Sequence, residues 1–379
     1  MEKLQSLFSL LSRENTTLLA TTLVTFSLIL IFFVNRGCPN WRNAPPGPKG
    51  WPIFGYLPYF GDHLNQDFFH LAKIHGPLFS LSMGQKPAIV ISSPEVAREF
   101  FRDNDEKISS RFITEVARCI GYDASTVVFE PYGARWQLLR KILKTEVFSA
   151  RAIALLQPTR AQEVQGLLRS AYSASQSKTA INISDTLFVL LGNIISNLVC
   201  SKNLFHSEKK EGRELRDMFY EILRIVITPN VSDLIPFLKP FDPQGLRRRS
   251  MKIAPKFDKL VDDRLEERKK ICFFAGTDTT PSTIEWGITE IFKNLEVYKK
   301  VLAELDNVVG KNRFVEETDI PKLIYFQAVI KEVFRLHPGV PLLIPRRFDK
   351  PCEIYGYNVP KNTIVFVNVW GMGRPTNMD

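Results

Sequence analysis

The sequence predicts a mainly α-helical protein with a small β-sheet region, preceded by one transmembrane helix. Three observations support this fold class: an uncharged apolar run near the N-terminus, two short β-rich runs around Gly84, and helical periodicity from about Pro94 to His337. With 379 residues and 45% hydrophobic content, the chain can bury a large core.

The apolar run at residues 16–34, TTLLATTLVTFSLILIFFV, contains no charge over nineteen residues. A helix of about this length crosses a bilayer. A cleaved signal peptide is the alternative, but the run is long for one, and no clear small-x-small cleavage site follows it. Three basic residues (Arg36, Arg42 and Lys49) lie just beyond the run, so the positive-inside rule places residues 1–15 in the lumen and the rest in the cytosol.

Four prolines follow within APPGPKGWP, at positions 45, 46, 48 and 52. Because proline fixes φ and excludes helix, residues 35–52 are predicted to form a stiff hinge that holds the body at a set angle to the membrane. An ordinary proline-rich linker is the alternative. Residues 53–379 then form the body of the protein.

The body begins with a predicted hairpin, because PLFSLSMG and KPAIVISS are β-rich runs on either side of a turn. Helices are predicted from about Pro94 to His337, and strand-like stretches return in CEIYGY and NTIVFVNVW. The proline-rich segment at residues 228–250 should be a loop-rich break, with the arginines at 247–249 at a solvated helix start.

Charge and cysteine content narrow the function classes. The net charge of +10 favours anionic phospholipid or an acidic protein partner, whereas the dispersed basic residues argue against nucleic acid. The five cysteines are far apart and form no C-x-x-C pair, so they are interpreted as reduced thiols: Cys38, Cys119, Cys200, Cys272 and Cys352.

The segment FFAGTDTTPSTIEW, residues 273–286, starts apolar and then gathers small and hydroxylated residues. On a helix these share nearly one face and form a shallow dent that suits a flat molecule: Ala275, Gly276, Thr279, Thr280 and Thr283. The alternative is that the threonines bond back to carbonyls one turn earlier and Asp278 faces solvent.

Two further pairs sit at helical spacing. Trp136 and Arg140 are four residues apart, so an indole N–H and a guanidinium can point at one carboxylate or phosphate. Glu332 and Arg335 can form an ion pair on one helical turn, and the apolar sequence around them predicts that the pair is partly buried. A half-buried Trp beside a surface Arg, and a surface ion pair, are the alternatives.

Three motifs follow the apolar span and the proline-rich hinge: the Trp136–Arg140 pair, residues 275–280, and the Glu332–Arg335 pair. Taken together in this order, they resemble the motifs of the cytochrome P450 family. The family's oxygen-activating helix has the pattern Ala/Gly-Gly-x-Asp/Glu-Thr-Thr/Ser, which AGTDTT at residues 275–280 matches. Its Trp-x-x-x-Arg and Glu-x-x-Arg motifs fall on the two pairs above. The stretches at 229–249 and 368–374 are similar to the plant microsomal geraniol hydroxylase-like group.

The resemblance implies a haem-thiolate monooxygenase with haem b, which inserts one oxygen atom of O2 into a small apolar substrate. For this branch the substrate would be a monoterpenoid alcohol. Electrons would come from NADPH through a reductase, with cytochrome b5 as a further partner. The protein would be a single-pass protein of the endoplasmic reticulum membrane, with its catalytic body facing the cytosol.

The resemblance also implies roles for individual residues. Ala275 and Gly276 would leave room for dioxygen, and Asp278 with Thr279 would relay protons to it. The haem propionates would be bound by three residues: Trp136, Arg140 and Arg347. Glu332 and Arg335 would form a structural ion pair.

The sequence departs from the family pattern in two places. RLEERKK at 264–270 runs directly into ICFFAGTDTT, a shorter connection than the family's. The motif Phe-x-x-Gly-x-Arg-x-Cys-x-Gly, whose cysteine binds the iron, does not occur, so no metal ligand is predicted and the fold is expected to be C-terminally incomplete. Two functions therefore stand: a membrane-bound monooxygenase by family, or a catalytically inactive truncated product that is at most a membrane-bound interaction protein.

Overall fold

The structure is a computed structural model of the chain. It describes residues 21–22, 24–25, 41, 43–105, 107–121, 123–200, 203, 205, 210–262 and 270–374, and gives side chains for these except 103–104, 199–200, 210–211 and 260–278. Most of the predicted anchor at 16–34 lies outside the described residues. Within the described ranges, no helix is both long and apolar enough to cross a membrane.

Helices make up most of the described chain, as the sequence predicts. In order, they are η1 (Leu57–Tyr59), α2 (Leu64–His75), α3 (Pro94–Asn104), α4 (Glu115–Ile120), α5 (Ala134–Ile142), η2 (Leu143–Val147), α6 (Ala150–Leu155), α7 (Gln157–Ser177), α8 (Ile183–Cys200), α9 (Lys210–Ile227), α10 (Val231–Leu234), η3 (Pro236–Leu238), α11 (Leu246–Asp262), α12 (Lys270–Lys293), α13 (Leu295–Val308), η4 (Glu317–Lys322), α14 (Ile324–Leu336) and α15 (Val369–Met372).

Two small sheets accompany the helices. The larger has the strand order β1-β2-β6-β3 and is built from β1 (Leu78–Met83), β2 (Lys86–Ile91), β6 (Ile364–Val367) and β3 (Arg346–Arg347). β1 and β2 form the predicted antiparallel hairpin, whereas β2 and β6 pair in parallel. The second sheet is the hairpin of β4 (Cys352–Ile354) and β5 (Tyr357–Val359).

The stretch CEIYGY is therefore a hairpin and not one strand. Tyr355 and Gly356 both have positive φ, at 52° and 73°, and this places the turn in the middle of the stretch. Likewise, NTIVFVNVW ends as a strand at Val367 and continues into the short helix α15. The break at 228–250 contains only α10 and η3 before α11 begins at Leu246 with three exposed arginines, as predicted.

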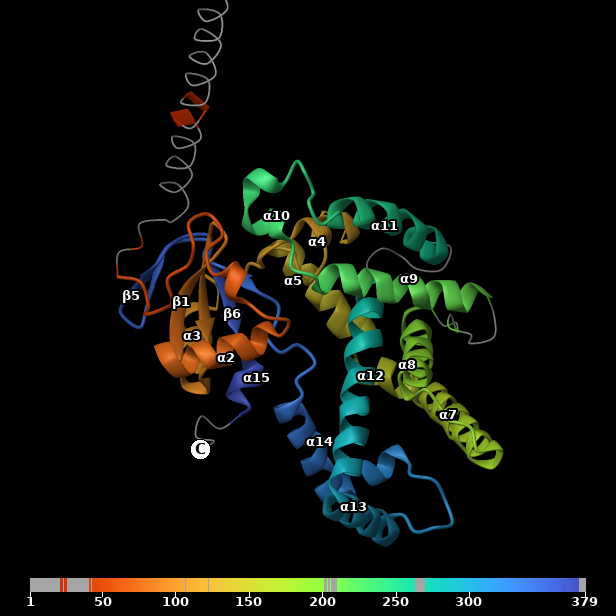
Figure 1. Ribbon diagram of the computed structural model, residues 1–379. Helices are drawn as coiled ribbons and strands as arrows, with labels where there is room; N and C mark the ends of the chain where they lie inside the picture. Colours follow the sequence, from red (N-terminus) through yellow and green to blue (C-terminus); the bar gives the residue numbers. More distant parts are fainter. Residues whose placement is uncertain are drawn as a thin grey trace, which may run out of the picture.

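Figure 1 shows the sheets with α2, α3 and α15 on one side of the molecule and the long helices α7, α8, α9, α11 and α12 on the other. Side chains of β2 alternate between two cores: Ala88 and Val90 pack towards α2, whereas Ile89 and Ile91 pack towards α3. A third core joins α4, α8, α9 and α11 around the fully buried Phe219. α12 packs along α8 and α14, which makes it the central helix of the body.

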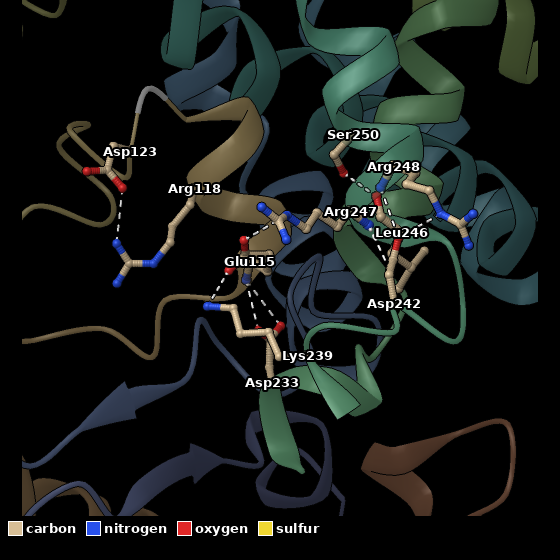
Figure 2. Close-up of polar contacts among 10 residues, drawn as sticks. All are labelled: Glu115, Arg118, Asp123, Asp233, Lys239, Asp242, Leu246, Arg247, Arg248 and Ser250. Atoms are coloured by element: carbon tan, nitrogen blue, oxygen red, sulfur yellow. Dashed lines mark hydrogen bonds and ion pairs between the residues drawn. The ribbon is translucent and has the colours of Figure 1, made fainter. Parts of the chain in front are cut away.

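A cluster of charged residues fastens the 228–246 segment to α4 (Figure 2). The Glu115 carboxylate lies 2.8 Å from Lys239 Nζ and 3.4 Å from Arg247 Nε. The Asp242 carboxylate accepts hydrogen bonds from the backbone N–H groups of Arg247 and Arg248, at the start of α11. Only 13% of the Glu115 side chain is exposed, so these ion pairs are better shielded than ordinary surface pairs.

Candidate functional site

The central helix α12 carries the predicted oxygen-activating motif. Its sequence is compatible with a helix because the hydroxyls find acceptors within it: Thr283 Oγ1 donates a hydrogen bond to the carbonyl of Thr279 at 2.9 Å. Pro281 lies inside the helix and has no backbone N–H, so one backbone hydrogen bond of the helix cannot form. The predicted site residues Ala275, Gly276 and Asp278 lie within α12, but their side chains are outside the described part of the structure.

A groove of about 800 Å³ runs along the C-terminal half of α12. Its walls come from α12, α14, the loop after α14 and the start of α15, and the lining is almost wholly apolar. The lining residues are Thr279, Thr280, Thr283, Ile284, Gly287, Ile288, Ile291, Phe326, Ile330, Phe334, Pro338, Gly339, Val340, Leu343 and Val369. The three threonines of the predicted dent therefore lie on one wall of one groove.

The opposite wall comes close to Thr279. A methyl group placed on Gly339 would lie 3.6 Å from Thr279 Cβ, an ordinary contact distance. A methyl group on Gly287 would lie 3.9 Å from Val333, which is also an ordinary contact distance. The Thr279 hydroxyl is one of the few polar groups of the groove.

Trp136 and Arg140 lie together on α5, but not as two free donors. The Trp136 indole N–H donates to the carbonyl of Val127 at 3.1 Å. The Arg140 guanidinium lies over the Trp136 ring, 5.2 Å from its centroid. Arg140 is exposed, and neither residue lines the groove. Their predicted role in propionate binding stays a prediction.

Arg347 is on β3, where its Nη2 lies 3.2 Å from Asp349 Oδ1 and its Nε is buried without a hydrogen-bond partner. Strand alternation places its neighbour Arg346 on the other face. There Arg346 pairs with Arg111 across an isolated antiparallel bridge. The Arg111 guanidinium donates to the carbonyl of Ile344, just after the groove-lining Leu343.

Arg111 is a residue that the sequence analysis missed. Burial, reinforced by the charge of Arg346, lowers the pKa of Arg111 to about 10, because both effects disfavour its charged form. An anionic partner would therefore stabilise the charged form of the Arg111 guanidinium. No local pattern predicts this pairing, because 235 positions separate the two arginines.

Glu332 and Arg335 form the expected ion pair on α14. Arg335 Nε and Nη2 lie 2.7 and 2.5 Å from the two carboxylate oxygens of Glu332, and this bidentate contact lowers the pKa of Glu332. The predicted partial burial is wrong: the two side chains are 53% and 43% exposed. Arg335 also donates to the carbonyl of Gly373, so the pair ties α14 to the segment after α15.

His337 ends α14 and has its own partners. Its ring stacks on Trp286 with centroids 3.9 Å apart and planes 8° apart. Its Nε2 lies 3.1 Å from Glu290 Oε1. Both partners come from α12, so this ring helps to hold α14 against α12.

Two cysteine side chains lie in the described part of the structure, those of Cys119 and Cys352. Burial raises the pKa of both, which keeps them protonated at neutral pH. Neither lines the groove. Among the described residues, no three His, Cys, Asp or Glu side chains gather in a way that could hold a metal ion.

The fold agrees with what similarity to known proteins shows. The cytochrome P450 family model matches residues 45–272 and 270–378, so the chain belongs to the cytochrome P450 family. The two matched segments overlap at residues 270–272, the first residues of α12.

Among its relatives, the chain is 35% identical to iridoid oxidase of Catharanthus roseus, over 92% of this chain and 77% of that protein. It is 35% identical to geraniol 8-hydroxylase of the same plant, over 94% and 80%. A flavonoid 3'-monooxygenase of Crocosmia x crocosmiiflora is 33% identical, over 93% and 77%. The resemblance to plant P450 enzymes of the geraniol hydroxylase type is thus confirmed.

The cofactor of this family is haem b, and NADPH supplies its electrons through a reductase. The described residues fit this group in part. The unpartnered Nε of Arg347 suits a carboxylate acceptor. Cys119 and Cys352, the two cysteines whose side chains are described, lie outside the groove.

Proposed function

We propose that the chain is a membrane-bound P450 monooxygenase that hydroxylates a small apolar substrate, with a monoterpenoid alcohol as the substrate class. The apolar groove beside Thr279 carries this proposal, because it offers hydrocarbon contacts and few polar ones. Two of the relatives are iridoid oxidase and geraniol 8-hydroxylase, and their names support a terpenoid substrate.

The residues of the chain would act by binding and by moving protons. The groove walls would hold the substrate and exclude water. Thr279, with Asp278 beside it in sequence, would move protons into the site through its Oγ1 hydroxyl. When bound, haem would supply the activation of O2. Its carboxylates would be held by Trp136, Arg140 and Arg347, and the unpartnered Nε of Arg347 supports this role.

We also propose the cellular setting. The uncharged run at 16–34 would anchor the protein in the endoplasmic reticulum membrane, with its body in the cytosol. The net charge of +10 would favour an acidic reductase and cytochrome b5 as partners.

Thr279→Ala tests the proposal. The full chain is expressed in microsomes with an NADPH-dependent P450 reductase and supplied with geraniol. We expect the variant to divert NADPH-derived electrons from hydroxylated product to hydrogen peroxide, because proton delivery is lost. Thr289→Ala is the matched control, since Thr289 lies on the same helix but outside the groove. Equal coupling of NADPH to product in wild type and Thr279→Ala would exclude the role.

A second candidate function is a haem-free, membrane-bound interaction protein. It is favoured by the position of Cys119 and Cys352, the two cysteines whose side chains are described, outside the groove. A reduced carbon-monoxide difference spectrum of the purified chain separates the two functions. The red-shifted band of thiolate ligation supports the monooxygenase, and its absence supports the haem-free protein.

A further inference from the structure

The loop that follows α14 forms the groove wall opposite Thr279. A methyl group on Gly339 in this loop would lie 3.6 Å from Thr279 Cβ and 3.8 Å from the Thr279 carbonyl oxygen. Pro338 and Val340, on either side of Gly339, also line the groove. The position of this short stretch therefore determines how open the groove is beside Thr279.

The later part of the loop is fixed by backbone hydrogen bonds. The Trp370 N–H of α15 donates to the carbonyl of Pro341 at 3.2 Å. The Phe112 N–H, shortly before α4, donates to the carbonyl of Pro345 at 3.0 Å. Within the described part of the chain, no backbone–backbone hydrogen bond reaches residues 338–339. The stretch that faces Thr279 therefore depends on the residue that precedes it.

That residue is His337, which is bound to both helices of the groove. Its backbone N–H donates to the carbonyl of Val333 on α14 at 2.8 Å. Its imidazole ring lies flat on the Trp286 indole of α12, with ring centroids 3.9 Å apart and planes 8° apart. Its Nε2 lies 3.1 Å from Glu290 Oε1. Aromatic stacking favours a defined ring geometry, so the position of His337 relative to α12 is fixed.

Both partners of the His337 ring belong to one face of α12. Trp286 and Glu290 are four residues apart, which places them one turn apart on that face. Two contacts one turn apart fix the ring along the helix axis as well as across it. Only 15% of the His337 side chain is exposed, so water competes little for these contacts. The last turn of α14 therefore cannot slide along α12 without breaking the stack.

We propose that His337 is a positioning residue for the groove, because its stacked ring holds Gly339 against Thr279. Without the ring, residues 338–340 move away from α12 and the groove widens beside Thr279. The consequence for hydroxylation rests on the proposed monooxygenase function, since only then does the space beside Thr279 determine where a substrate lies.

A disulfide across the groove measures this position without any catalysis. The distance between the two Cβ positions, 3.6 Å, lies within the disulfide range of about 3.5 to 4.5 Å. Thr279→Cys with Gly339→Cys should therefore form a disulfide, while oxidised glutathione takes up the two electrons and two protons and becomes two molecules of glutathione. Peptide mass spectrometry of the full chain identifies the cross-link and measures its rate of formation.

Three further substitutions in this double-cysteine background test the ring. His337→Ala removes the stack and should slow cross-linking at least about fivefold, because the two thiols are no longer held together. His337→Phe keeps a flat ring for Trp286 and should restore most of the rate. His70→Ala is the matched control and should leave the rate unchanged, since His70 is an exposed histidine of α2 outside the groove.

Three results would overturn the proposal. The first is the absence of a cross-link when His337 is present, because Gly339 would then not lie at Thr279. The second is a rate that His337→Ala does not change. The third is a rate for His337→Phe as low as that for His337→Ala, because the stacked ring would then not be what holds the loop.

Turnover of the chain without the two cysteine substitutions tests the consequence separately. In microsomes with an NADPH-dependent P450 reductase and geraniol, His337→Ala should raise KM more than it lowers kcat, because binding in the groove is weakened. His337→Phe should restore KM. A KM that His337→Ala leaves unchanged would overturn the link to the substrate. If the wild type forms no hydroxylated product, the proposed function fails, whereas the cross-linking rates still decide the role of His337.

Discussion

The Asp233 carboxylate accepts the backbone N–H of Glu115 with both oxygens, at 3.0 and 3.2 Å, although 118 residues separate the two. Glu115 is the first residue of α4, so a side chain from α10 satisfies one of the free N–H groups of another helix. Burial raises the pKa of Asp233, and the nearby Glu115 carboxylate adds to this effect, whereas the hydrogen bond from the Glu115 backbone opposes it.

This contact predicts different outcomes for two substitutions of Asp233. Asp233→Ala removes the acceptor and should lower the free energy of unfolding by about 1 kcal/mol, as for a lost helix cap. Asp233→Asn keeps an oxygen acceptor without the charge, so it should cost less at pH 7. Urea unfolding followed by circular dichroism measures both, and equal losses would contradict the role assigned to the oxygen.

The same pair predicts a pH dependence. Because the pKa of Asp233 is higher in the folded than in the unfolded state, the folded state binds more protons in that range. The contribution of Asp233 to stability is therefore greatest in acid and falls as the pH rises through its folded pKa. Asp233→Asn should remove this component, so the wild-type minus variant difference in unfolding free energy should fall with pH. A flat difference would count against the raised pKa.

Glu115 should matter for its side chain as well. Glu115→Gln removes the charge that faces Lys239 and Arg247, and we expect a loss of about 1 to 2 kcal/mol in the free energy of unfolding. Arg118→Gln is the matched control on the same helix (Figure 2). Its pair with Asp123 is 47% and 82% exposed, so the expected loss is below about 0.5 kcal/mol. A loss for Arg118→Gln as large as that for Glu115→Gln would refute the distinction between the pairs.

Glu304 of α13 caps the start of α14. Its two carboxylate oxygens accept the backbone N–H groups of Tyr325 and Phe326 at 2.7 and 2.8 Å. Glu304→Ala should destabilise the fold by about 1 to 2 kcal/mol, because both N–H groups lose their partner. Glu296→Gln on the same helix, in an exposed pair with Lys299, should cost far less. Thermal unfolding of both variants checks this, and indistinguishable midpoints would contradict the cap.

Local pattern predicted those features that depend on neighbours in sequence. The threonine face of α12 and the β1–β2 hairpin follow from periods of 3.6 and 2 residues, and the structure shows both. The long-range contacts around the candidate site could not be predicted in this way. Arg111 pairs with Arg346, and His337 stacks on Trp286. The two residues of each pair are too far apart in sequence for a helical or strand period to relate them.

Trp136 shows why the spacing of a motif does not determine which partners its side chains bond to. The spacing of Trp136 and Arg140 correctly placed them on one helix face, but the indole N–H had a nearer acceptor in Val127, nine residues before it. Burial was misjudged at Glu332 and Arg335 for a related reason. Apolar neighbours in sequence point to the other faces of α14, so they do not cover the pair.

The last prediction concerns the two described thiols. Burial raises the pKa of Cys119 and Cys352, and only the thiolate reacts with iodoacetamide. Alkylation of each site, followed by peptide mass spectrometry across pH 6 to 10, should therefore reach half its maximal rate at a higher pH than a free cysteine does. In urea the two profiles should shift down to the ordinary thiol range, because the desolvation is lost. A folded-state profile that already matches a free thiol would show that one of these cysteines is available as a thiolate. It would then reopen that residue as a ligand for the haem iron, which Cys119→Ser and Cys352→Ser would test in the reduced carbon-monoxide spectrum.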